Sequence, residues 1–283
     1  MKNVSFYIRI TLLVLCVAVF LVSGVMLIRI LAGYGAADKT YESINEGFDV
    51  LTDSPETGTE PEEEQYEDEV DDIPMVSFRT DMTEQMRGQY QYLMELKAEY
   101  PNVVGYISIP SLSINYPVVR TDNNDYYLDH LITGEESATG SIFLDYRCGT
   151  DPLSARNSVI YGHNMNNGAM FHNLEMLFTL ENFLGATVEY ICEEGIFFYK
   201  PLSVYRADAT YPFARFEFAD NKTYETFCRT AIAKSQFTES EQVVCAYDSN
   251  VITLVTCTNS LASKTGRYVY QAVLDTVYLV EAE

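Results

Sequence analysis

The 283-residue sequence has few basic side chains and only three histidines. Its 18 lysines and arginines stand against 41 aspartates and glutamates, which gives a formal net charge of -23. A surface of that sign repels phosphate backbones, so we do not expect a nucleic-acid-binding protein. The sequence also lacks a CxxC pair, an internal repeat, a glycine-rich phosphate loop and a His-rich tract. These absences argue against a zinc module, a repeat protein and a nucleotide-binding fold.

Cysteine is present but not in the pattern of a disulfide scaffold. One of the six cysteines, Cys16, lies in an apolar run, and the other five are irregularly spaced. Because five is an odd number, at least one of these thiols stays free or pairs between chains. We expect mostly free thiols, and we interpret four of the five as buried core residues: Cys148, Cys192, Cys228 and Cys245.

The N-terminal segment predicts a membrane anchor. Residues 10–28 form an uncharged run of 19 residues, which at about 1.5 Å per residue is long enough to cross a hydrocarbon core of about 30 Å. Lys2 and Arg9 precede the run and Arg29 follows it. We therefore expect residues 1–9 in the cytoplasm, residues 10–30 as a single-pass signal-anchor, and the remainder outside the cell membrane. The apolar run is longer than a usual signal-peptide core, although the "LAGYGAA" that follows leaves cleavage as an alternative.

An acidic segment separates this anchor from the rest of the chain. Residues 38–72 hold fifteen acidic side chains and a single lysine. Such a segment has too little apolar surface to offset the entropy cost of ordering, and its charges repel one another. We therefore expect residues 31–75 to form an extended, flexible stalk that acts as a spacer, and residues 76–283 to form the folded domain.

The folded domain has the pattern of a mainly β protein. Residues 81–99 show helical spacing and end before Pro101. About eight short segments rich in β-branched and aromatic residues follow, separated by Gly, Asn, Asp and Pro, which favours a barrel or sandwich. Two further stretches have helical spacing, residues 167–178 and residues 222–235, and the second lies in the long connection before the last strand pair. The expected strands fall within residues 103–110, 114–119, 140–146, 157–163, 186–193, 195–208, 251–257 and 267–280.

Three residues at strand ends carry the chemistry we expect. Cys257 ends the apolar run "VITLVTC", and Arg267 opens the next strand, so a hairpin would bring the two together. A nucleophilic thiolate needs a basic neighbour, and His163, at the end of the strand in "NSVIYGH", is the best placed of the three histidines. His130 and His172 are interpreted as structural. The spacing alone does not decide whether Cys257 is a buried core thiol or a nucleophile.

These motifs, in this order, resemble the sortase family and its class B in particular. "TLVTC" with an arginine ten positions after the cysteine, and "YGHNM" upstream, carry the resemblance together with "NVVGYISIPSLSINYPVV", "NDYYLDH" and "GSIFLDYR". The resemblance covers about residues 85–280. It implies a closed sortase β-barrel of about eight strands, an N-terminal helix, and a helix in the loop before the catalytic strand. It also implies a membrane-bound cysteine transpeptidase that cleaves a C-terminal sorting motif of exported proteins.

The same resemblance implies roles for individual residues. Cys257 would be the nucleophile, His163 the general acid and base, and Arg267 the stabiliser of the oxyanion or substrate carbonyl. Val255, Thr256 and Tyr127 would bind substrate, and no metal or other cofactor is expected. The implied partners are exported proteins with a sorting motif, an amine of a peptidoglycan precursor or a pilin, and the cytoplasmic membrane.

Some positions depart from the family pattern. Class B members often have serine where Val255 stands, an acidic residue where Thr258 stands, and tryptophan where Tyr106 stands. Because Val255 lacks a hydroxyl that would bind the sorting peptide, we expect a motif different from the NPxTN type. We expect Tyr106 to change packing only.

Two alternative functions use the same features. A thiol hydrolase or peptidase would keep the Cys257 and His163 pair but transfer the acyl group to water. A non-catalytic, membrane-tethered β-barrel that binds a partner would leave Cys257 and His163 far apart. The relative positions of these two residues therefore separate the enzyme interpretations from the binding module.

Overall fold

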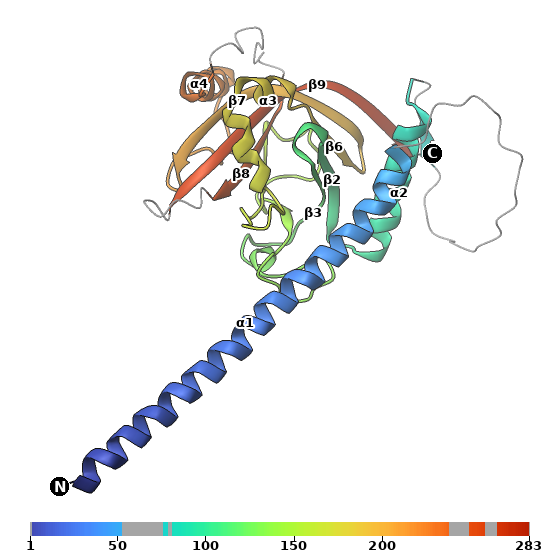
Figure 1. Ribbon diagram of the computed structural model, residues 1–283. Helices are drawn as coiled ribbons and strands as arrows, with labels where there is room; N and C mark the ends of the chain where they lie inside the picture. Colours follow the sequence, from blue (N-terminus) through green and yellow to red (C-terminus); the bar gives the residue numbers. More distant parts are fainter. Residues whose placement is uncertain (1, 53–75, 79–80, 238–248, 258–264, 283) are drawn as a thin grey trace, which may run out of the picture.

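The computed structural model describes residues 2–52, 76–78, 81–237, 249–257 and 265–282. Every segment that we expected to be a strand forms one, and a three-residue strand is added near the N-terminal end of the domain. Figure 1 shows a strongly curved sheet with helices around it and one long helix extending away from it. The strands are β1 (Val76–Phe78), β2 (Val103–Ile109), β3 (Ile114–Val119), β4 (Ile142–Leu144), β5 (Asn157–Tyr161), β6 (Val188–Cys192), β7 (Gly195–Asp208), β8 (Val251–Cys257) and β9 (Gly266–Ala282).

The sheet closes on itself into a barrel. The strand order is β1-β9-β7-β6-β2-β3-β4-β5-β8, and β8 also pairs with β9. The eight strands from β2 to β9 form the closed ring, and β1 extends it at the edge of β9. Most pairs are antiparallel, but β3 with β4 and β5 with β8 are parallel. The buried side chains inside the ring form one large apolar cluster, so the interior is a packed core and not a channel.

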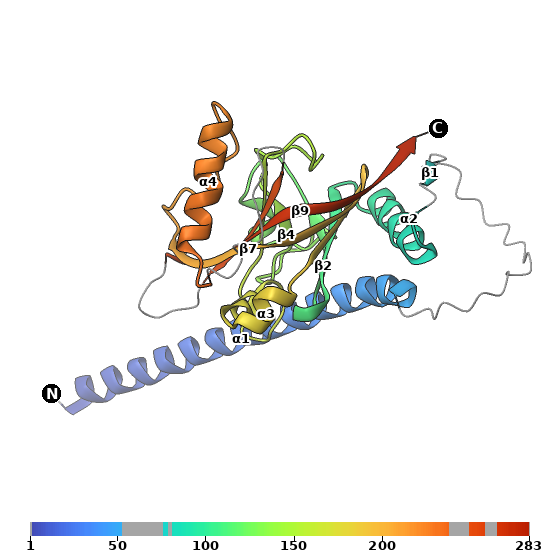
Figure 2. The same cartoon turned by 90° about the horizontal axis from the view of Figure 1, so that it is seen from above.

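Two of the expected helices form where their sequences predict them. Helix α2 (Glu84–Glu99) begins after Thr83, whose hydroxyl accepts a hydrogen bond from Met86 N at 3.2 Å. Helix α4 (Asn221–Lys234) begins after Asp220, whose carboxylate accepts from Thr223 N at 2.8 Å. Figure 2 shows α4 on one side of the barrel and the long N-terminal helix on the opposite side.

The expected helix over residues 167–178 is only partly present. Gly168 and Met170 have φ angles of 89° and 59°, which are incompatible with a right-handed helix. The chain therefore turns first and then forms a 3₁₀ helix, His172–Phe178, followed by the short helix α3 (Leu180–Gly185). Two further 3₁₀ turns, Pro110–Leu112 and Tyr126–Leu128, connect strands.

The N-terminal helix α1 (Lys2–Thr52) corrects our expectation of a flexible stalk over residues 31–52. Ala37, Tyr41, Ile44 and Phe48 are buried, and their spacing of three and four places them on one helix face. Phe48 stacks on Tyr106 with ring centroids 4.1 Å apart. Eleven of the fifteen acidic residues of the segment lie beyond residue 52, so averaging the charge over the whole segment hid this apolar face. The remaining part of the expected stalk, residues 53–75, lies outside the described residues.

The part of α1 before this packed face has a different environment. Its window Arg9–Met26 is long and apolar enough to cross a membrane, and none of it is buried in the protein. It is the one helix of this kind among the residues that the structure describes.

Candidate active site

The parallel pair β5 and β8 brings two of the predicted residues to one edge of the sheet. Tyr161 at the end of β5 lies opposite Val255 of β8. The pairing continues beyond the strand, because Gly162 N donates to Val255 O at 3.1 Å. Since parallel strands end at the same edge, His163 and Cys257 leave the sheet side by side.

The hairpin of β8 and β9 brings the third predicted residue to the same edge. Cys257 lies directly opposite Arg267 in the antiparallel register, which separates their Cβ atoms by about 5 Å. The Arg267 guanidinium donates from Nη1 to Gly266 O at 2.9 Å and is partly buried. The sequence-based prediction that a hairpin joins Cys257 and Arg267 is therefore confirmed.

The three predicted side chains line one cavity of about 210 Å³. Cys257 is a free thiol with intermediate exposure, so it borders the cavity without being sealed in the core. A binding module with Cys257 and His163 far apart is not what this geometry supports. The cavity is lined by Asn124, Leu128, Phe143, Tyr161, Gly162, His163, Val255, Thr256, Cys257 and Arg267.

The His163 ring is held through one of its two nitrogens. Its Nε2 lies 2.7 Å from the carbonyl oxygen of Leu128. Because a carbonyl oxygen only accepts hydrogen bonds, Nε2 carries the proton, and in the neutral ring Nδ1 holds the lone pair. This bond selects the tautomer and orients the ring, as a backbone carbonyl commonly does for a histidine that transfers protons.

A hydrogen-bonded chain that the sequence did not predict ties the histidine segment to the cysteine. Asn164, 8% exposed, donates from Nδ2 to the carbonyl oxygen of Cys257 at 2.8 Å. Its Oδ1 lies 2.7 Å from His172 Nδ1, and His172 Nε2 lies 3.5 Å from Glu175 Oε1. His172 thus supports the site from outside the cavity. His130 stacks on Tyr126, with ring centroids 4.1 Å apart, at the surface.

A buried carboxylate, which the sequence analysis did not single out, holds two residues of the cavity lining in place. The side chain of Asp145 is fully buried and forms an ion pair with Arg147, from Nη2 at 2.7 Å. It also accepts from Asn124 Nδ2 at 2.9 Å and from Tyr161 OH at 3.0 Å, and both of these residues line the cavity. The motifs "NDYYLDH" and "GSIFLDYR" contain Asn124 and Asp145, so the family resemblance was the available signal.

The pKa values of Asp145 and Tyr161 are shifted in opposite directions. Burial raises the pKa of the Asp145 carboxyl, but hydrogen bonds from the side chain and backbone of Arg147 and from Asn124 outweigh it and hold the pKa below its usual value. The bond from Tyr161 has the reverse effect on the phenol, since burial and the nearby carboxylate raise the pKa of Tyr161. Asp145 is therefore an ionised anchor for Asn124 and Tyr161.

The three residues expected to bind substrate are placed differently. Val255 and Thr256 line the cavity, and among the described residues the buried hydroxyl of Thr256 has no hydrogen-bond partner. Tyr127 is not among the residues that line the cavity. It is 3% exposed, and burial raises the pKa of its phenol despite a hydrogen bond from Asn102. The structure thus does not support Tyr127 as a substrate contact. Thr258 lies outside the described residues.

The structure describes three of the four remaining cysteines of the folded domain. Cys148 and Cys192 are buried free thiols, and burial raises the pKa of Cys148 to about 11. Cys228 is disulfide-bonded, a pairing that the sequence left open. Cys245 lies outside the described part. Within the described ranges, no group of three His, Cys, Asp or Glu side chains could hold a metal ion.

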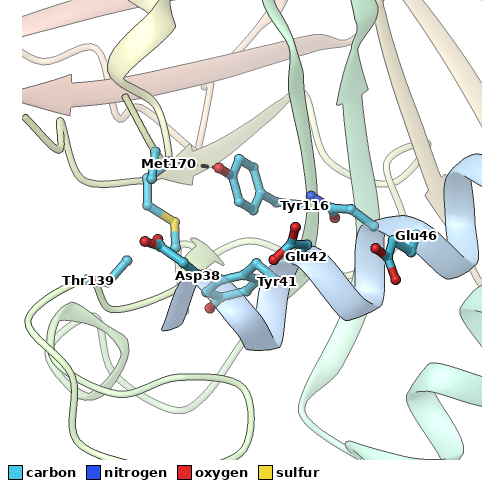
Figure 3. A pocket seen from close by; sticks show the side chains of 9 residues that line it. Asp38, Tyr41, Glu42, Glu46, Tyr116, Thr139 and Met170 are labelled. Carbon is cyan, nitrogen blue, oxygen red and sulfur yellow. Dashed lines mark hydrogen bonds between the residues drawn. The ribbon is translucent and has the colours of Figure 1, made fainter. Parts of the chain in front are cut away.

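A larger cavity, of about 510 Å³, lies between α1 and the barrel. Figure 3 shows the carboxylates of Asp38, Glu42 and Glu46 along α1, opposite Tyr116 and Met170 of the barrel. Tyr116 OH accepts from Met170 N at 3.0 Å. No residue of this cavity also lines the cavity around Cys257.

Comparison with known proteins decides the family. The model of the sortase domain family matches residues 107–275. The chain belongs to the class B sortases. It is 30% identical to sortase B of Listeria monocytogenes over 210 residues, which is 73% of this chain and 84% of that protein.

Solved structures agree with this assignment. The Staphylococcus aureus sortase B–substrate complex is 25% identical, with a TM-score of 0.60 over 66% of this chain and 86% of that one. A sortase B structure complexed with triglycine is also 25% identical, with a TM-score of 0.59 over the same shares. The closed barrel predicted from the sequence is confirmed, and the protein is a sortase-type cysteine transpeptidase.

Proposed function

We propose that this sortase B homologue cleaves a C-terminal sorting motif of exported proteins with Cys257 as nucleophile. The observation that carries the proposal is that Cys257, His163 and Arg267 line one cavity at the ends of three neighbouring strands. A thiol, an imidazole with a selected tautomer and a permanent cation are the groups that acyl transfer needs.

The reaction divides into two halves. The Cys257 thiolate attacks the scissile carbonyl, and the Arg267 guanidinium stabilises the oxyanion that forms. The C–N bond breaks, His163 protonates the leaving amine, and a thioester links the acyl group to Cys257. His163 then takes a proton from an incoming amine as that amine attacks the thioester, and Cys257 leaves as the thiolate.

The acceptor is proposed to be an amine of a peptidoglycan precursor or a pilin. The related structure complexed with triglycine supports an amine-bearing peptide as acceptor class. Water, at about 55 M, competes with it, and a positioned acceptor overcomes that competition through effective molarity. A hydrolase with the same residues is the second candidate function.

The helix α1 is proposed to anchor the enzyme in the cell membrane, with the N-terminus in the cytoplasm and the barrel outside. The buried Ala37 lies eleven positions after Met26, the end of the apolar window, which is a rise of about 16 Å along a continuous helix. The barrel would therefore be held at a short, fixed distance from the membrane surface. That position suits substrates and acceptors that are themselves membrane-linked.

Peptide assays test the proposal. The full chain in detergent is incubated with LPxTG, SPxTG and NPxTN peptides, with and without triglycine, and the products are identified by mass spectrometry. We expect cleavage, a triglycine adduct, and loss of both in Cys257→Ala, while the control Cys16→Ala keeps them. Cleavage by Cys257→Ala at the parent rate would refute the mechanism, and cleavage that never yields the adduct would favour the hydrolase.

A further inference from the structure

Helix α1 forms a buried polar contact with the loop before β4. Tyr41 of α1 is 5% exposed, and its hydroxyl oxygen lies 3.1 Å from Gly140 O and 2.8 Å from Ser141 Oγ. The Ser141 hydroxyl itself donates to His130 O at 2.8 Å. Because a hydroxyl has only one proton, Tyr41 is the donor to this loop. Burial raises the pKa of the Tyr41 phenol above its usual value, so the phenol keeps that proton at neutral pH.

The loop held by α1 packs directly against the carbonyl group that orients the histidine. Ser141 N donates to Tyr127 O at 3.0 Å. Gly140 has a φ angle of 58°, and a Cβ atom there would lie 2.6 Å from Tyr127 O and 2.7 Å from Leu128 O. Only glycine fits, because the loop backbone approaches both carbonyl groups so closely. Since Leu128 O lies 2.7 Å from His163 Nε2, the position of the loop limits where that acceptor can lie.

A second path of contacts joins Tyr41 to the backbone of His163. The ring of Tyr41 packs edge to face against Tyr116 of β3, with centroids 5.6 Å apart. Figure 3 shows the Tyr116 hydroxyl directed at Met170, whose backbone N donates to it at 3.0 Å. The next amide in the chain, Phe171 N, donates to His163 O at 2.9 Å. Tyr41 thus contacts both segments that hold the histidine, one at the ring and one at the backbone.

We propose that Tyr41 is a positioning residue for His163, which makes the docked α1 part of the arrangement that orients the histidine. This role rests on the proposed function of His163 in proton transfer. Without the Tyr41 hydroxyl, Gly140 O and Ser141 Oγ lose a buried donor, and the loop can move away from Leu128 O. The imidazole then loses the fixed acceptor that selects its Nε2–H tautomer, and fewer molecules hold the ring ready for proton transfer.

Two matched substitutions separate this role from simple docking of α1. Tyr41→Phe removes the hydroxyl but keeps the ring that packs on Tyr116. Tyr92→Phe is the control, because the Tyr92 hydroxyl on α2 donates to Ile44 O of α1 at 2.8 Å. Each variant therefore costs α1 a hydrogen bond from a tyrosine hydroxyl, but only Tyr41→Phe removes the bond to the loop before β4. Near-UV circular dichroism checks that both variants keep the fold.

The first measurement is the tautomer of His163 in the full chain in nanodiscs, read from the ¹⁵N chemical shifts of histidine-labelled protein without any peptide. The chain has only three histidines, and the signal lost in His163→Gln identifies His163. We expect the neutral ring to be mainly the Nε2–H tautomer in the parent and in Tyr92→Phe, and a larger share of the Nδ1–H tautomer in Tyr41→Phe. The same tautomer distribution in Tyr41→Phe and the parent would overturn the proposal.

The second measurement is the cleavage of a sorting peptide by the same three proteins. Tyr41→Phe should lower kcat about three- to tenfold with little change in KM, since one buried hydrogen bond is lost away from the substrate. Tyr92→Phe should cleave at the parent rate. Equal kcat in Tyr41→Phe and the parent, or an equal loss in both variants, would contradict a positioning role. If the parent cleaves no peptide, the proposed function fails, and the tautomer measurement still decides the role of Tyr41.

Discussion

Replacing Asp145 with alanine tests the buried support of the active site. The carboxylate is fully buried and accepts five hydrogen bonds: from Arg147 N at 3.0 Å, Nε at 2.9 Å and Nη2 at 2.7 Å, from Asn124 Nδ2 at 2.9 Å, and from Tyr161 OH at 3.0 Å. Removing one partner of a buried ion pair costs about 3–5 kcal/mol. Because the Arg147 side chain is 46% exposed and regains water, we expect the lower end, about 3 kcal/mol.

The pH dependence of this loss distinguishes a charge effect from a packing effect. The folded-state pKa of Asp145 lies below its usual value, so the stability it contributes is present above the unfolded pKa of about 3.9. That contribution is lost as the pH falls through the lower, folded pKa. The difference in unfolding free energy between parent and Asp145→Ala should therefore be full at pH 7 and shrink below about pH 4.

The assay is urea unfolding followed by near-UV circular dichroism, since the chain has 22 tyrosines and no tryptophan. The control is Asp129→Ala, which removes a carboxylate that is 70% exposed, and it should change the unfolding free energy little. A loss below about 1 kcal/mol for Asp145→Ala, or a loss that does not depend on pH, would refute this account of the buried carboxylate.

Three further predictions concern other parts of the molecule. Asn164→Ala removes the bond to the Cys257 carbonyl and should lower kcat about tenfold with little change in KM or in near-UV circular dichroism; an unchanged kcat would exclude a positioning role. Phe48→Ala removes a ring that is 1% exposed and should weaken docking of α1 by about 3 kcal/mol, measured as faster limited proteolysis of α1. Burial raises the pKa of the Glu189 carboxyl to about 7, so between about pH 4.5 and 7 this carboxyl is protonated in the folded state and ionised in the unfolded state. The free energy of unfolding of the parent therefore falls as the pH rises through this window. The gain in unfolding free energy of Glu189→Gln over the parent should rise by up to about 3 kcal/mol across that window, and a flat difference would contradict the pKa shift.

The strands could be predicted because each is a short segment of β-branched and aromatic residues bounded by turn-forming residues. Each expected strand of residues 103–280 is present, and the β8–β9 register places Cys257 opposite Arg267, as the hairpin interpretation required. Strand β1 was not predicted, since three residues carry no detectable period. The packed face of α1 was missed for another reason: its four buried residues are spread over twelve positions among charged ones.

The supports of the site were less predictable because they join residues far apart in the sequence. The bond from Asn164 to Cys257 spans 93 positions, and the one from Tyr161 to Asp145 depends on the pairing of β4 with β5. Tyr127, which the motif placed at the site, is buried and is not among the residues that line the cavity. A motif identifies which residues gather at a site, but only the register decides which side chains face the cavity.

The most direct test of the central claim is the intact mass of the enzyme after brief exposure to a cleavable sorting peptide without an amine. The account predicts a mass increase equal to the acyl fragment, located on Cys257 by peptide mapping, labile to hydroxylamine and absent in Cys257→Ala. Adding triglycine should discharge it and return the free enzyme. An acyl group on any other residue would contradict a thioester mechanism at Cys257. Peptide turnover by the parent enzyme without a covalent intermediate would contradict it as well.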